Sequence, residues 1–70
     1  MTDTEMLRDY IDKSGLKLQF IAEKVGISRE SLSQKINNRS EFKAREIQIL
    51  CDLVGIDSPE KQHRVFFMPN

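Results

Sequence analysis

Apolar residues recur at helical spacing along almost the whole chain, and this pattern predicts an all-α fold. Apolar positions three and four residues apart predict five helices, at about 3–13, 18–24, 29–37, 44–54 and 59–65. The strict alternation that is typical of strands is nearly absent. The chain of 70 residues is therefore expected to form one small helical domain.

Glycine and serine residues mark the ends of the predicted helices. Gly15, Gly26 and Gly55 each follow an apolar periodic run, where a helix end favours a residue that tolerates a positive φ. Ser28 and Ser58 each precede a run, where a side-chain oxygen can cap the first free N–H groups. The segments between these signals are short, so consecutive helices must pack closely.

The second and third predicted helices have the spacing of a helix-turn-helix unit. Ala22 is small where the third helix must cross the second, and Gly26 permits a sharp turn four residues later. Leu32 falls six residues after Gly26, on the inward face of the third helix. Only Leu32 and Ile36 are apolar on that helix, so most of its surface is expected to face outward.

At this point the sequence resembles a known family. The segment LQFIAEKVGISRESLSQKINN at 18–38 is similar to the helix-turn-helix of the Cro and CI phage repressors, or XRE family. The following EFKAREIQILCDLVGI at 41–56 resembles that family's fourth helix, and SPEKQHRVFF at 58–67 resembles the tail of small Cro-like regulators. The resemblance implies a compact five-helix Cro/CI-type fold, with the helix-turn-helix at about 18–37 and a short hydrophobic tail at 66–70.

The resemblance also implies a function. A chain of this kind would be a sequence-specific regulator of transcription, such as a phage or prophage Cro-like repressor in a lysis–lysogeny switch. Its third helix would enter the major groove of double-stranded operator DNA. A single helix reads about 4 to 5 base pairs, too few to select one site, so a homodimer on a palindromic operator is expected.

The family's pattern assigns two sets of residues. The base-reading positions are Arg29, Glu30, Ser33 and Gln34, whose side chains suit guanine, cytosine and adenine edges. The phosphate-binding positions lie at the starts of the second and third helices and in the loop after the third. They are Lys17, Gln19, Ser28, Asn37, Asn38, Arg39 and Lys43.

Charge weakens the DNA interpretation overall but supports it locally. The formal net charge is zero, whereas DNA affinity comes largely from Lys and Arg. Residues 27–45 nevertheless hold five basic and two acidic side chains. The neutral charge and the apolar Phe66, Phe67 and Met68 keep an alternative open, namely a modulator or antirepressor that binds a CI-like repressor protein. The two phenylalanines either fold back on the core or form a dimer seam.

The remaining chemistry argues for exclusions. Cys51 shares a face with apolar residues and is expected in the core. One cysteine and His63 alone provide no disulfide, no structural zinc site and no catalytic set, so neither an enzyme nor a cofactor is expected. The chain has no signal peptide pattern and no apolar run of the length that a membrane span needs. A cytoplasmic, nucleoid-associated protein of a bacterial host is expected.

Overall fold

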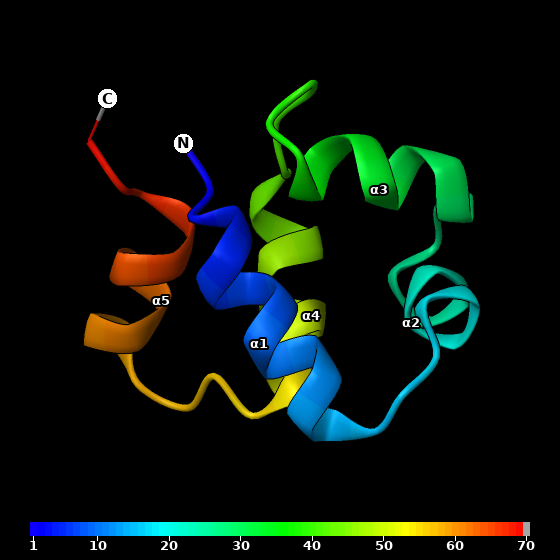
Figure 1. Cartoon of the computed structure of the whole chain (residues 1–70), viewed down its shortest axis with the longest axis horizontal. Helices are drawn as coiled ribbons and strands as arrows, with labels where there is room; N and C mark the ends of the chain where they lie inside the picture. Colours follow the sequence, from blue (N-terminus) through cyan, green and yellow to red (C-terminus); the bar gives the residue numbers. More distant parts are fainter. Residues whose placement is uncertain (70) are drawn as a thin grey trace.

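The computed structural model describes residues 1–69 and confirms the all-α prediction. Its five helices are α1 (Thr4–Ser14), α2 (Leu18–Val25), α3 (Arg29–Ile36), α4 (Ala44–Val54) and α5 (Pro59–Phe66) (Figure 1). Every predicted helix is present, and no end differs from the prediction by more than one residue. The boundary signals explain this agreement, because a capping side chain or a glycine stands at six of the ten helix ends.

Three helices begin at a side-chain cap, and two of these caps are the predicted serines. The carboxylate of Asp3 accepts a hydrogen bond from the Met6 N–H at 3.0 Å. The hydroxyl of Ser28 accepts one from the Ser31 N–H at 3.0 Å, and Ser58 likewise caps α5. Each cap satisfies a donor that has no partner within its own helix, which fixes where the helix starts.

The core lies where α4 packs against α1 and α2, and α3 closes over one side of it. In Figure 1, α1 and α4 cross in the middle of the molecule, with α2 and α3 to one side and α5 to the other. The largest side chains with no more than 2% exposure come from all five helices and the α4–α5 turn. They are Leu7, Ile21, Val25, Leu32, Leu50, Cys51, Ile56 and Val65.

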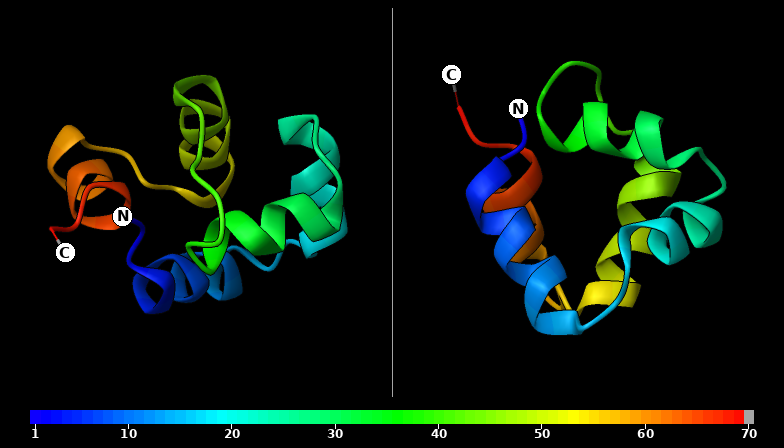
Figure 2. Two further views of the ribbon diagram at one scale, coloured as in Figure 1. Left: turned by 90° about the horizontal axis from the view of Figure 1, so that it is seen from above. Right: turned by 45° about the vertical axis from the view of Figure 1, so that its right-hand side comes forward.

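The two ends of the described chain lie together beside α5. The Asp3 N–H donates to the Val65 carbonyl at 2.6 Å, and the Met68 N–H donates to the Met1 carbonyl at 3.0 Å. Both views in Figure 2 place α5 at the end of the molecule opposite α2. The chain ends are therefore remote from the start of α2.

The structure places one of the two tail phenylalanines in the core and the other at the surface. Phe66 is only 5% exposed and packs edge-on against Phe42, with ring centroids 5.3 Å apart. Phe67 is 55% exposed, and its ring lies beside that of His63. Phe66 therefore belongs to the core, while Phe67 remains available at the surface.

Candidate nucleic-acid interface

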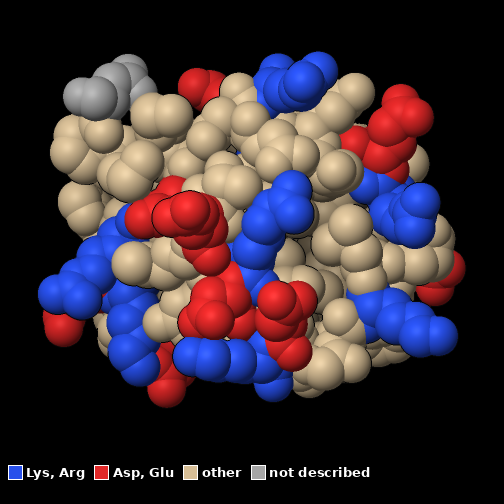
Figure 3. All heavy atoms as spheres, in the orientation of Figure 1, with Lys and Arg blue, Asp and Glu red and all other residues tan. Residues whose placement is uncertain are grey.

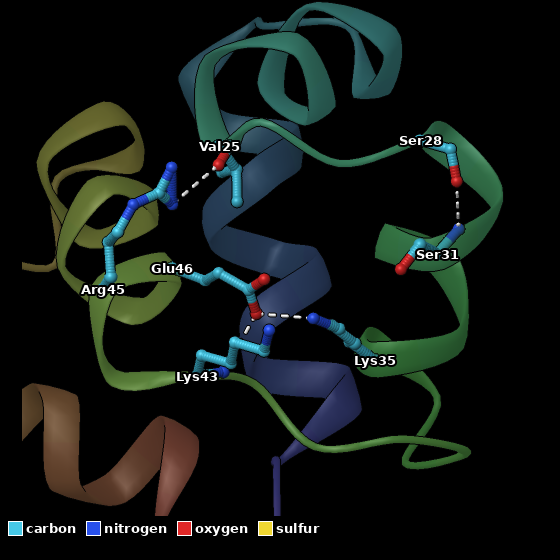
Figure 4. Close-up of polar contacts among 7 residues, drawn as sticks. All are labelled: Val25, Ser28, Ser31, Lys35, Lys43, Arg45 and Glu46. Carbon is cyan, nitrogen blue, oxygen red and sulfur yellow. Dashed lines mark hydrogen bonds and ion pairs between the residues drawn. The ribbon is translucent and has the colours of Figure 1, made fainter.

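The turn between α2 and α3 has the geometry that the glycine predicts. Gly26 has a φ of 91°, and its N–H donates to the Ala22 carbonyl at 2.9 Å. Arg45, from the first turn of α4, donates through Nη1 to the Val25 carbonyl at 3.1 Å (Figure 4). The guanidinium therefore caps the end of α2 and holds the turn in place. Ala22 is fully buried, which leaves α3 room to approach.

The exposed face of α3 carries the predicted base-reading residues. Leu32 and Ile36 are buried and attach the helix to the core, as predicted. Arg29, Glu30 and Gln34 are exposed, and Ser33 is partly exposed. The three ion pairs found among residues 1–69 do not involve Glu30. The helix thus presents polar side chains outward from its amino end.

Lys35 is buried, although the sequence pattern placed it among the basic residues of the surface. It was counted among the basic residues of 27–45, but its side chain is 10% exposed and its ammonium lies 2.6 Å from Glu46 Oε1 (Figure 4). The same oxygen accepts a hydrogen bond from the Lys43 N–H at 2.9 Å. Lys35 therefore adds no charge to the outer surface of α3.

The environment of Glu46 favours its ionised form. Burial on its own raises the pKa of this carboxyl, because a charge is poorly solvated in the interior. The hydrogen bonds from the Lys35 ammonium and from the Lys43 backbone outweigh burial and hold the pKa of Glu46 below its ordinary value. The Glu46 carboxylate links α3 to α4 through its ion pair with Lys35.

The loop after α3 is shaped by two asparagines that were predicted to bind phosphate. The amide of Asn37 accepts a hydrogen bond from Arg8 Nη2 at 2.9 Å. Asn38 has a φ of 64°, and its amide both donates to the Thr2 carbonyl and accepts from the Thr2 N–H, each at 2.8 Å. The side chain of Asn38 is therefore committed to the amino-terminal segment, which anchors the loop.

All seven predicted phosphate-binding residues lie at the surface. Lys17 is the residue before α2 and leaves its first N–H groups without a side-chain cap. Gln19 is exposed and donates to Glu23 Oε2 at 3.2 Å. Arg39 and Lys43 are exposed on the α3–α4 loop. These residues form two groups, one at the starts of α2 and α3 and one at the end of α3.

Arg8 lies between these two groups and was missed by the sequence reasoning. It lines a hollow of about 350 Å³ together with Leu18 at the start of α2 and Ser33 on α3. On the sequence, Arg8 is one of several charged residues on the outer face of the first helix. Its place beside Asn37 depends on how α1 packs against α3, and no local signal carries that information.

The fold and this polar surface define a small helix-turn-helix protein. A family model described as helix-turn-helix matches residues 7–61, which is more than half of the chain. The chain therefore belongs to this XRE-type helix-turn-helix family of DNA-binding transcriptional regulators. Neither the comparison with curated proteins nor that with solved structures gave a match.

Two further features complete the description of residues 1–69. None of their helices combines the length and the apolar character needed to cross a bilayer. They also contain no group of three or more histidine, cysteine, aspartate or glutamate side chains placed to hold a metal ion.

Proposed function

We propose that this chain is a sequence-specific repressor that reads operator DNA by inserting α3 into the major groove. The observation that carries the proposal is the division of α3 into two faces. Its buried face is held by Leu32, Ile36 and the ion-paired Lys35, and its outer face is polar from the first residue onward. A helix fixed in this way can present side chains to base edges without moving.

Base reading falls to the exposed side chains of α3. Arg29 can donate two hydrogen bonds to guanine O6 and N7, and Gln34 can pair with adenine N6 and N7. Glu30 can accept from cytosine N4, while Ser33 suits either kind of partner. Arg29 is at the amino end of α3, which enters the groove first in this class of complex.

Phosphate binding fixes the orientation of α3. One set of phosphate contacts comes from the starts of α2 and α3. It consists of the uncapped N–H groups of α2 and the side chains of Lys17, Gln19 and Ser28. The other set comes from the α3–α4 loop, through Asn37, Arg39 and Lys43. Asn38 keeps the loop in shape through its hydrogen bonds to Thr2. Arg8 joins the phosphate contacts, because it is exposed and bonded to Asn37. Such contacts supply affinity but no sequence information.

Selectivity requires two copies. A homodimer would place two α3 helices in successive major grooves, about 34 Å apart along a palindromic operator. Residues 1–70 would act as one DNA-binding domain in the cytoplasm, on the nucleoid. A phage or prophage Cro-like repressor of this kind would act by covering a promoter.

A binding-site selection from random duplexes, followed by mobility shifts, tests the proposal. Wild-type protein should select a palindrome, and Arg29→Ala and Gln34→Ala should each weaken binding by about 1–3 kcal/mol and relax one base position. Arg64→Ala, on the remote helix α5, is the matched control and should bind as wild type does. No selection and no shift at low salt would overturn the DNA proposal.

One observation favours a second candidate, a modulator that binds a CI-like repressor protein. Phe67 is 55% exposed on a chain with zero net charge. The salt dependence of binding separates the two candidates. DNA binding through several phosphates weakens steeply with salt, whereas association through an apolar protein surface does not.

A further inference from the structure

A surface with few charged side chains lies beside the start of the chain and the end of α5, and we call it the tail patch. It comprises Met1, Phe42, Ile47, Phe66 and Phe67. Phe67 and Met1 are 55% and 51% exposed, more than any other large apolar side chain among the described residues. Exposed apolar side chains that gather in one place mark interaction sites far more often than single ones do.

The tail patch contains a protruding aromatic ring next to a hollow. The hollow has a volume of about 440 Å³, and its floor includes the edge-on pair Phe42 and Phe66. Phe67 stands at its rim, with its N–H bonded to the His63 carbonyl at 3.0 Å. Because Phe67 follows directly on the buried Phe66, its backbone is held in place.

The charge around the hollow is low for this protein. Glu41 is the one charged side chain among the nine residues that line the hollow, whereas 31% of the chain is charged. The amino terminus of Met1 adds one positive charge, and it donates to the Met68 carbonyl at 3.1 Å. Figure 3 shows mostly uncharged side chains at the upper left, whereas charged ones lie across the lower half and the right-hand side. A surface without Lys or Arg side chains suits a protein partner rather than DNA.

We propose that the tail patch binds the tail patch of a second copy of this chain. In an isologous two-fold interface each surface must complement itself, so a protruding group needs a matching hollow on the same patch. Phe67 and the adjacent hollow meet this condition, since Phe67 of each copy can enter the hollow of the other. A buried aromatic anchor in a pocket is also the usual source of interface affinity. This inference rests on the dimer of the proposed function.

The tail patch is joined to the end of the DNA-reading helix. Thr2 and Asn38 line the hollow and are hydrogen-bonded to each other through the Asn38 amide. The Thr4 hydroxyl donates to the Ile36 carbonyl, the last residue of α3, at 2.6 Å. A second copy seated in the hollow therefore rests against the segment that fixes the α3–α4 loop. Association and DNA binding should stabilise each other.

Sedimentation equilibrium of the full chain without DNA, from about 1 μM to about 1 mM, tests this inference. Wild type should change from monomer to dimer within this range. Phe67→Glu replaces the protruding ring with a charged side chain, and Ser40→Glu places a charge in the lining of the hollow. Each should raise the dimer dissociation constant at least about tenfold. Phe20→Glu is the matched control, because Phe20 is 40% exposed on α2, away from the patch.

The outcomes separate this inference from the function on which it rests. A wild-type protein that stays monomeric throughout the range overturns the inference, and so does an equal effect of Phe20→Glu. If the monomeric wild-type protein still selects and binds a DNA sequence, the proposed repressor function is unaffected. Conversely, dimers that dissociate on Phe67→Glu and Ser40→Glu, in a protein that selects no DNA, support the patch and overturn the function. Circular dichroism of each variant confirms that it is folded.

Discussion

The ammonium of Lys35 and the carboxylate of Glu46 lie 2.6 Å apart, with side chains that are 10% and 5% exposed. Lys35 is in the last turn of α3, and Glu46 is in the first turn of α4. The carboxylate also accepts a hydrogen bond from the Lys43 N–H, so one side chain fixes α3 and both ends of the loop that follows it. A buried pair of this kind is stabilising only while both partners are present.

Glu46→Ala should therefore lower the free energy of unfolding by about 3–5 kcal/mol, because it leaves the Lys35 ammonium buried without a counter-charge. Urea unfolding measures the change. The double variant Lys35→Met with Glu46→Leu should lose clearly less than the sum of the single losses. Lys61→Met removes an exposed pair with Asp57 and should leave stability almost unchanged. If the double variant loses as much stability as the two single variants together, Lys35 and Glu46 are not energetically coupled.

The stability of the protein should fall in acid partly through Glu46. Its pKa is lowered in the folded state, so its contribution is complete above the ordinary glutamate pKa of about 4.3 and is lost as pH falls towards the folded value. Urea unfolding of wild type and Glu46→Gln between about pH 7 and pH 3 tests this. The stability advantage of wild type over the variant should shrink as the solution becomes more acidic. A constant difference would show that the pKa of Glu46 is the same in both states.

The Cys51 thiol should be unreactive in the native protein. Burial raises its pKa to about 11, and the side chain is 2% exposed. An ordinary thiol has a pKa of about 8.5, so near pH 8 it is alkylated readily while Cys51 is not. Mass spectrometry after treatment with iodoacetamide should show labelling only in denaturant. Rapid labelling of the folded chain would place Cys51 outside the core.

Periodicity and caps were enough to predict the five helices, because each boundary depends on residues within a few positions. Leu32 and Ile36 were placed correctly on the inward face of α3 by spacing alone. Lys35 was not, since its partner Glu46 lies eleven positions away on another helix. A lysine beside a narrow apolar stripe looks like a surface residue until the opposing carboxylate is seen.

Other parts of the site depend on packing that the sequence pattern does not contain. Arg8 meets Asn37 because α1 crosses α3, and Asn38 holds Thr2 because the amino-terminal segment runs beside the loop. The pattern also could not separate Phe66 from Phe67, since both are apolar and adjacent. They differ because the ring of Phe66, at the end of α5, turns inward against Phe42.

Gly26→Ala should destabilise the protein more than Gly15→Ala. Both glycines have a positive φ, which costs another residue about 1–2 kcal/mol. A Cβ at Gly26 would also lie 3.3 Å from Arg45 Nη2, whereas a Cβ at Gly15 would meet nothing within 4 Å. Thermal unfolding should show a larger drop in melting temperature for Gly26→Ala than for Gly15→Ala. This difference between the two variants should become smaller in an Arg45→Ala background. Equal losses in the wild-type background would show that the guanidinium moves aside freely.

Arg8→Ala should weaken DNA binding without changing its sequence preference. Each phosphate contact contributes about −0.9 to the slope of log affinity against log salt, so the slope should become shallower by about that amount. Arg8→Lys keeps the charge and should keep most of the slope. Arg64→Ala, an exposed arginine on α5, is the control and should change neither quantity. Titrations of a selected duplex and a scrambled duplex between about 50 and 200 mM salt give both measurements. A changed ratio between the two duplexes would instead assign Arg8 to base reading, and an unchanged slope would remove it from the interface.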